Sequence, residues 1–125
     1  MYKILVIDDD PSGTELLITL LGLEGFQGSG LEDWADPLAD VERDQPDLVI
    51  MDVYLSGWDG VELLGAIRAH PEPRIANTPV LMMSAEDLKS RCLSAGANGF
   101  VGKPFELQKL MATIREIMEV GLLED

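Results

Sequence analysis

The chain has 125 residues, a length typical of one domain, and 46% of them are hydrophobic, which is enough for one packed core. A single cysteine and a single histidine exclude an internal disulfide and a thiolate zinc cage, and they leave Ser/His/Asp catalysis with little support. The formal net charge of −14 would repel a phosphate backbone, which argues against direct nucleic-acid binding.

Short aliphatic runs alternate with longer helical segments along the chain, a pattern typical of βαβ units around a mostly parallel sheet. The run 2–7 predicts a strand buried on both faces, and the leucine stripe after it predicts a helix from about Ser12 that Gly25 ends. Two glycines in 26–30 favour only a short edge strand. Asp36, followed by proline, predicts the N-cap of a helix that runs to about residue 43.

The apolar run 47–53 is the next strand, and it carries Asp52 at its carboxyl end. Ser56 with Asp59 three residues later resembles a capping box, which predicts a helix from Ser56 to about residue 69. Three prolines between 70 and 79 indicate a loop.

Two further strand and helix pairs complete the pattern. The predicted strands are 79–83 and about 98–102, and the predicted helices are about 86–94 and 105–119. The last helix places apolar side chains on one face at helical spacing.

This organisation predicts one domain over residues 1–120 and a short tail over 121–125. No stretch approaches the roughly 18 to 20 uninterrupted apolar residues of a membrane helix, and the N-terminus does not resemble a signal peptide. We therefore expect a cytoplasmic protein with no membrane partner.

Unusual polar groups follow four of the five predicted strands. They are Asp8 and Asp9, Asp52, Ser84, and Lys103. In an open parallel sheet, ligands bind outside the carboxyl ends of the strands, so these side chains are expected to meet at one rim.

Three neighbouring carboxylates favour a bound cation. Two carboxylates about 4 Å apart repel by roughly 4 kcal/mol at an effective dielectric constant near 20, so three together need protons or a cation. Oxygen ligands without histidine or cysteine favour Mg²⁺, or Mn²⁺, over zinc. A metal, an aspartate nucleophile, a lysine and a hydroxyl together describe a site for phosphoryl transfer.

Four segments carry a family resemblance that covers nearly the whole chain: ILVIDDDP, PDLVIMDVYLSGWDG, PVLMMSA and GFVGKPF. In this order the chain resembles the response-regulator receiver domains of two-component signalling. The resemblance implies a flavodoxin-like, doubly wound five-stranded parallel sheet, strand order 2-1-3-4-5, with five surrounding helices. It further implies a phosphorelay switch, not an enzyme, that assists its own phosphorylation and dephosphorylation. A histidine kinase or phosphotransfer protein would phosphorylate Asp52.

The same resemblance implies the metal ligands. Asp9 is the direct ligand, Asp8 contributes through a water molecule, and Asp52 and the backbone carbonyl of Tyr54 complete the protein's share. The expected cation is Mg²⁺, with Mn²⁺ as a substitute.

Residues that would handle the phosphoryl group are also implied. Ser84 is expected to contact it, and Lys103 matches the lysine of the family, with a cis bond to Pro104. Phe100 occupies the position of the aromatic switch, and a core role for its ring fits this position equally well.

Two residues near Asp52 are the subject of separate predictions. Ser56 stands where the family usually has proline, and we interpret it as a helix cap without a catalytic role. Tyr54 is bulky for its position, so we hypothesise that its ring shields an acyl phosphate from water.

Three functions remain open. In the first, phosphorylation changes the face formed by 86–94, 98–102 and 105–119, and so controls the binding of a downstream protein or output domain, or dimerisation. In the second, two acids spaced by one residue after the first strand belong to a phosphatase of the haloacid-dehalogenase type, although the chain has no room for a cap domain. In the third, a receiver-like module binds partners without phosphorylation.

Overall fold

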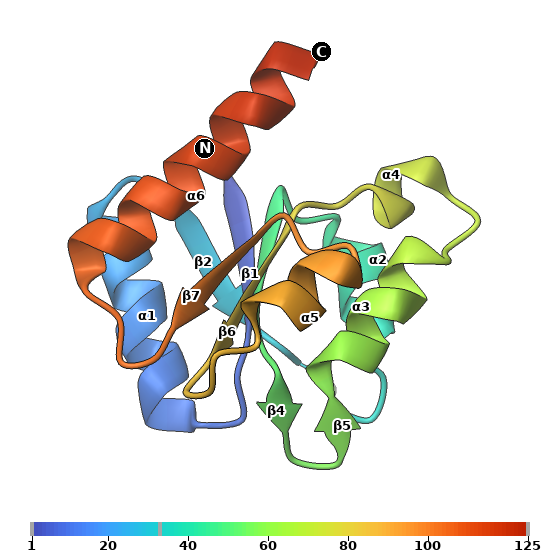
Figure 1. Cartoon of the computed structure of the whole chain (residues 1–125), viewed down its shortest axis with the longest axis horizontal. Helices are drawn as coiled ribbons and strands as arrows, with labels where there is room; N and C mark the ends of the chain where they lie inside the picture. Colours follow the sequence, from blue (N-terminus) through green and yellow to red (C-terminus); the bar gives the residue numbers. More distant parts are fainter. Residues whose placement is uncertain (1, 33, 125) are drawn as a thin grey trace.

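The computed structural model describes residues 2–32 and 34–124, with side chains through residue 119 (Figure 1). Five parallel strands form one sheet in the order β2-β1-β3-β6-β7. They are β1 (Lys3–Ile7), β2 (Gln27–Gly30), β3 (Leu48–Asp52), β6 (Val80–Ser84) and β7 (Gly99–Gly102). This order confirms the predicted flavodoxin-like arrangement, including the short edge strand β2.

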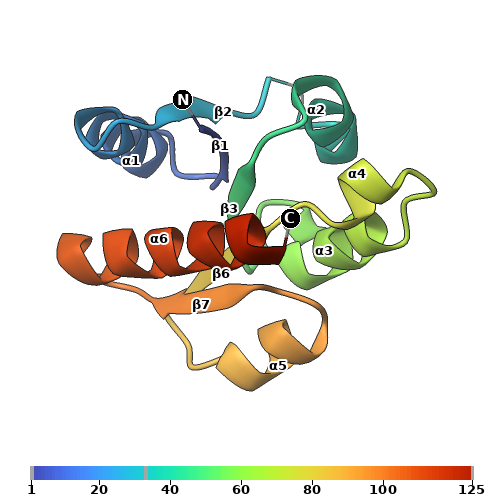
Figure 2. The same ribbon diagram turned by 90° about the horizontal axis from the view of Figure 1, so that it is seen from above.

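Six helices surround the sheet within the described residues, one more than expected. They are α1 (Pro11–Leu23), α2 (Pro37–Asp44), α3 (Gly60–Arg68), α4 (Pro73–Ala76), α5 (Lys89–Ser94) and α6 (Leu107–Glu124). Figure 2 shows α1 and α6 on one side of the sheet and α2, α3 and α5 on the other. The chain is therefore wound on both faces, as a doubly wound fold requires.

Each face of the sheet has its own hydrophobic core because strand side chains alternate in direction. In β1, Ile4 and Val6 pack toward α1 and α6, while Leu5 and Ile7 pack toward α2, α3 and α5. All four side chains are buried. Burial on both faces explains why the central strands read as continuous apolar runs.

The segment after β3 differs from the prediction. A small antiparallel hairpin, β4 (Tyr54–Leu55) and β5 (Trp58–Asp59), takes up the first residues of the helix predicted from Ser56. The N-cap of α3 is Asp59, whose side chain accepts from the N–H of Val61 at 2.8 Å. The predicted cap at Ser56 is therefore wrong, because the Ser56 side chain is bonded to Asp9 instead.

Other differences concern the ends of elements. The predicted loop 70–79 contains the one-turn helix α4, which begins at Pro73. Helix α5 begins at Lys89, later than expected, and α6 continues past residue 119 through most of the predicted tail. Asp125 lies outside the described residues, and the division at residue 120 stays a prediction.

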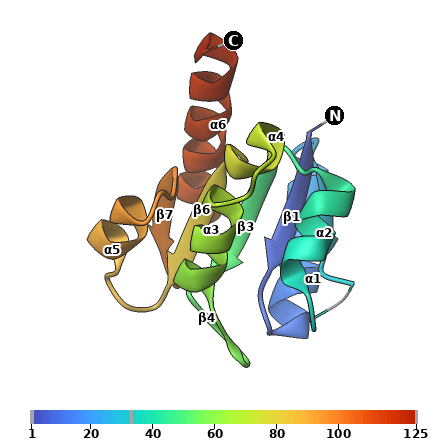
Figure 3. The same ribbon diagram turned by 90° about the vertical axis from the view of Figure 1, so that its right-hand side faces the viewer.

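Different elements extend beyond the two ends of the sheet. Hairpin β4–β5 extends beyond the carboxyl ends of the strands, while the C-terminal part of α6 projects at the opposite end (Figure 3). The Lys103–Pro104 bond is cis, as the resemblance implies. None of the described helices is long and apolar enough to cross a bilayer.

Candidate functional site

The strand register brings the predicted site residues to one edge. Ile7 is level with Met51, Asp52 with Met83, and Ser84 with Gly102. The residues that end or follow these strands are Asp8, Asp9, Asp52, Ser84 and Lys103. The sheet therefore delivers all five to its carboxyl edge, as predicted.

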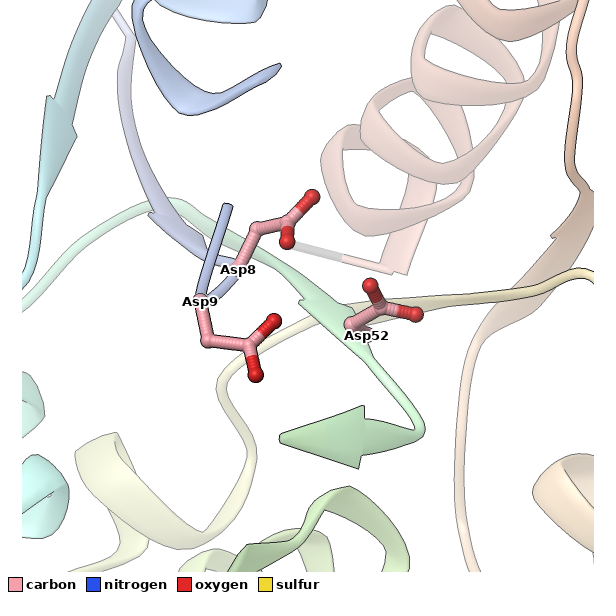
Figure 4. Close-up of side chains that lie close together, drawn as sticks. All are labelled: Asp8, Asp9 and Asp52. Carbon is pink, nitrogen blue, oxygen red and sulfur yellow. The ribbon is translucent and has the colours of Figure 1, made fainter. Parts of the chain in front are cut away.

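Asp8, Asp9 and Asp52 form a compact cluster. Each contributes a carboxylate oxygen, and the three oxygens lie within 4.8 Å of one another. Figure 4 shows the carboxylates of Asp8 and Asp9, which follow β1, converging on Asp52 from β3. Asp8 is buried, Asp52 is partly buried and Asp9 is exposed, so the cluster lies at the mouth of the sheet.

One lysine is shared between two of these acids. Lys103 Nζ donates to Asp52 Oδ2 at 2.6 Å and to Asp8 Oδ2 at 3.1 Å. The loop that carries it is fixed by the Lys103 backbone N–H, which donates to the carbonyl of Ser84 at 2.8 Å. A single positive charge cannot neutralise three carboxylates, so the site keeps an excess of negative charge.

The protonation equilibria reflect this imbalance. Burial raises the pKa of Asp52; the hydrogen bond from Lys103 opposes the shift, and the charges of Asp8 and Asp9 add to it. Burial lowers the pKa of Lys103, but hydrogen bonds to Asp52 and Asp8 outweigh burial and raise it overall. The lysine is thus firmly cationic, while Asp52 is a carboxylate that would gain from further positive charge.

Protein donors hold the other two carboxylates in place. Asp8 Oδ1 accepts from the backbone N–H of Asp10 at 3.0 Å. Asp9 Oδ2 accepts from both the backbone N–H and the hydroxyl of Ser56, each at 2.8 Å. Asp10 itself caps α1 by accepting from the N–H of Ser12.

The donor set fits a hard divalent cation. All three ligand candidates are carboxylate oxygens, no histidine or cysteine joins them within the described residues, and the local charge is negative. Such a set suits Mg²⁺ or Mn²⁺ better than zinc.

Ser84 and Tyr54 both contact Glu86, in the loop after β6. Ser84 is 1% exposed, and its hydroxyl accepts from the N–H of Glu86 at 3.1 Å. Tyr54 is 53% exposed, and its hydroxyl donates to Glu86 Oε2 at 3.2 Å, so its side chain reaches from β4 to the loop after β6. The charge of Glu86 raises the pKa of Tyr54. The backbone carbonyl of Tyr54 as a metal ligand stays a prediction.

The sequence does not predict the contacts of two residues at this site. For Ser56 it predicts a helix cap, whereas both donors of Ser56 bond to Asp9. The sequence does not single out Glu86, because its side chain meets the hydroxyl of Tyr54, a residue 32 positions away.

The sheet order and the acidic edge define a class of protein, a flavodoxin-like α/β domain with a cluster of three aspartates at the carboxyl edge of its sheet. Residues 4–115 match the response regulator receiver domain. The chain belongs to this family of two-component receiver domains.

Individual relatives agree with this assignment. The sensory transduction protein RegX3 of Mycolicibacterium smegmatis is 32% identical over 128 residues, which cover 100% of this chain and 54% of the relative. The DNA-binding response regulator MtrA of the same organism is 34% identical over 90% of this chain and 49% of its own length. The chain thus spans about half the length of these curated relatives.

A solved structure has the same fold. The crystal structure of a putative response regulator from Chloroflexus aurantiacus superposes with a TM-score of 0.85 at 31% identity. The match covers 94% of this chain and 98% of that one.

Proposed function

We propose that this receiver domain is a phosphorylation-controlled switch in which Asp52 accepts a phosphoryl group from a histidine kinase or phosphotransfer protein, with Mg²⁺ bound. The observation that carries the proposal is the position of Asp52. It ends a central strand among two other carboxylates, and Lys103 Nζ lies 2.6 Å from its Oδ2.

The chain's own residues account for the chemistry. A carboxylate oxygen of Asp52 attacks phosphorus, and the bond from phosphorus to the donor's imidazole nitrogen breaks. The imidazole, protonated on its other ring nitrogen, leaves as a neutral ring with the bond's electron pair. Lys103 and the hydroxyl of Ser84 are then available to bind phosphoryl oxygens. Neither Asp8 nor Asp9 needs to gain or lose a proton in this step.

The metal would be held by Asp9, by Asp8 through a water molecule, by Asp52 and by the carbonyl of Tyr54. When bound, Mg²⁺ offsets the charge of the carboxylates and of the incoming phosphoryl oxygens. Mn²⁺, with similar ligand preferences, is expected to replace it.

A groove beside the site favours a protein as the donor. Its volume is about 590 Å³, and residues of α1 and of the segment after β7 line it together with Asp8 and Lys103. Leu16 and Phe105 contribute apolar surface. A donor that presents a phosphohistidine to Asp52 would cover this groove, and apolar contact would stabilise the complex.

The output of the switch is proposed to be the face of α5, β7 and α6, which binds a downstream protein or output domain or a second copy of the chain. Leu93 on α5 is exposed there, and Phe100 on β7 is only partly buried. A groove lined by Leu93 and Phe100 is also lined by Lys89, Lys109 and Glu116, which gives this face both charge and apolar surface.

Acetyl phosphate, a small-molecule donor, tests the proposal. With Mg²⁺ present, intact mass spectrometry of the wild type should show the addition of one phosphoryl group that is stable in acid and labile in base. Asp52→Asn should show none. Equal labelling of both proteins would refute the assignment, and steady hydrolysis of a generic phosphate ester would point to a phosphatase instead.

A further inference from the structure

Ser56 makes a contact with the acidic cluster that its place in the chain does not predict. It lies in the turn between β4 and β5, and its backbone N–H and its hydroxyl both donate to Asp9 Oδ2, each at 2.8 Å. The two residues are 47 positions apart in the sequence. One side of the metal-site candidate is thereby fixed by the hairpin.

Both donors reach the same oxygen of Asp9. A carboxylate oxygen has two lone-pair sites in its plane, and two short hydrogen bonds occupy both on Oδ2. No donor among the described residues bonds to Oδ1, which stays free to bind a ligand. Figure 4 shows one carboxylate oxygen of Asp9 directed toward Asp52 and the other directed away.

A cation would therefore meet Asp9 through one oxygen only. Ca²⁺ takes six to eight oxygen ligands and often uses both oxygens of a carboxylate, whereas Mg²⁺ requires near-octahedral geometry with short, single-oxygen bonds. A carboxylate whose second oxygen is already saturated is a poorer ligand for Ca²⁺. The same two hydrogen bonds fix the orientation of Asp9, which makes it a better ligand for Mg²⁺.

We propose that Ser56 is a positioning residue that makes Asp9 a one-oxygen ligand and thereby favours Mg²⁺ over Ca²⁺ at this site. The inference rests on the proposed metal site and adds to it a determinant of selectivity. Ser56 acts through Asp9 and does not contact the metal.

Three substitutions distinguish the contributions of the two hydrogen bonds that Ser56 donates to Asp9. Ser56→Thr keeps both donors, Ser56→Ala removes the hydroxyl alone, and Ser56→Pro removes the hydroxyl and the N–H. Thermal melts across a series of Mg²⁺ or Ca²⁺ concentrations give the dissociation constant of each metal, because a ligand that binds the folded state raises the melting temperature. Trp58, two residues further on, provides fluorescence as a second readout.

The threonine variant should match the wild type. The alanine variant should bind Mg²⁺ about tenfold more weakly, a loss typical when a partner that orients a ligand is removed, and the proline variant more weakly still. Ca²⁺ binding should fall less or rise, so the preference for Mg²⁺ should shrink in the same order.

The outcomes distinguish this inference from the proposed function. If the wild type binds no Mg²⁺, the metal site itself fails. If the wild type binds Mg²⁺ but the alanine variant has the same Mg²⁺ affinity and the same preference over Ca²⁺, the role of Ser56 is refuted while the metal site stands. Equal losses in the threonine and alanine variants would also refute it. The alanine and threonine variants suffice should the proline variant not fold.

Discussion

Asp52 is held in a setting that does not favour its charge. It is partly buried beside Asp8 and Asp9, and Lys103 divides its hydrogen bonds between Asp52 and Asp8. Such a carboxylate is suited to accepting a phosphoryl group because the positive groups needed for the product are already nearby or are drawn in by the excess charge. Because of the same features, the charge of Asp52 destabilises the folded protein.

Asp52→Asn should therefore stabilise the metal-free protein at neutral pH, by roughly 1 kcal/mol or about 3–6 °C in melting temperature. The sign follows from the raised pKa of Asp52, because the folded state holds the proton more tightly than the unfolded state and loses stability as pH rises through the folded pKa. The difference between variant and wild type should narrow as pH falls through that pKa. A less stable variant in metal-free calorimetry at neutral pH would contradict this account.

Tyr54 spans the gap between the hairpin and the loop after β6, where its hydroxyl is bonded to Glu86. If its ring shields the acyl phosphate from water, Tyr54→Asn should shorten the lifetime of the phosphorylated protein. Tyr54→Phe, which keeps the ring and loses only the hydroxyl, is the matched control and should stay close to wild type. The loss of the phosphoryl group can be timed by intact mass, and an unchanged lifetime in the asparagine variant would remove the hypothesis.

Among the elements, helix α3 contacts the site at Gly60, where its backbone lies close to the backbone at the end of β3. The Gly60 N–H donates to the carbonyl of Val53 at 2.7 Å, and a Cβ at Gly60 would overlap the carbonyl oxygen of Asp52. Gly60→Ala should lower the free energy of unfolding by about 1–3 kcal/mol and slow phosphorylation of Asp52, because the strand end must shift.

Gly65 is the matched control on the same helix. A Cβ there would meet nothing within 4 Å, so Gly65→Ala should stabilise the protein by about 0.5–1 kcal/mol. Urea denaturation of both variants tests the pair. If Gly60→Ala proves as harmless as Gly65→Ala, the packing of α3 against the end of β3 is not as described.

Helix α1 offers a second test, in this case of the proposed donor surface. Leu16 is 61% exposed and lines the groove beside Asp8, while Leu23 is 78% exposed at the other end of the helix and does not line it. With a histidine-phosphotransfer protein that phosphorylates the wild type, Leu16→Gln should slow transfer by about tenfold, the effect of losing a central apolar contact. Leu23→Gln should not slow it.

Acetyl phosphate separates docking from chemistry in these variants, because it needs no protein surface. Both should accept the phosphoryl group from it at the wild-type rate. A donor protein that reacts equally well with Leu16→Gln and the wild type would show that the donor does not cover this groove.

At the scale of the whole molecule, the sequence predicts the features that follow from the spacing of apolar residues along the chain. Buried strands such as β1 and β3 read as apolar runs, and their acids fall where the runs stop, so the acidic edge follows from the parallel order of strands. The cap at Asp36 was also predictable, because Asp-Pro before a helix is a local signal.

What the sequence does not predict depends on contacts between distant segments. The capping-box pattern of Ser56 and Asp59 predicts a cap at Ser56. Asp9, which lies far away in the chain, engages Ser56 instead, and the helix begins after Asp59. The contact of Glu86 with the hydroxyl of Tyr54, 32 positions away, likewise requires the fold to exist first. One-turn helices such as α4 have too few residues for a periodic signal.

The central claim is that the phosphoryl group is carried by Asp52, and chemical mapping of the modified residue tests it most directly. Borohydride reduces an acyl phosphate of aspartate to homoserine, which tandem mass spectrometry locates within a peptide. After incubation with acetyl phosphate and Mg²⁺, we predict homoserine at residue 52 and unchanged aspartate at residues 8 and 9. Homoserine at either of those positions, or at none of the three, would contradict the account.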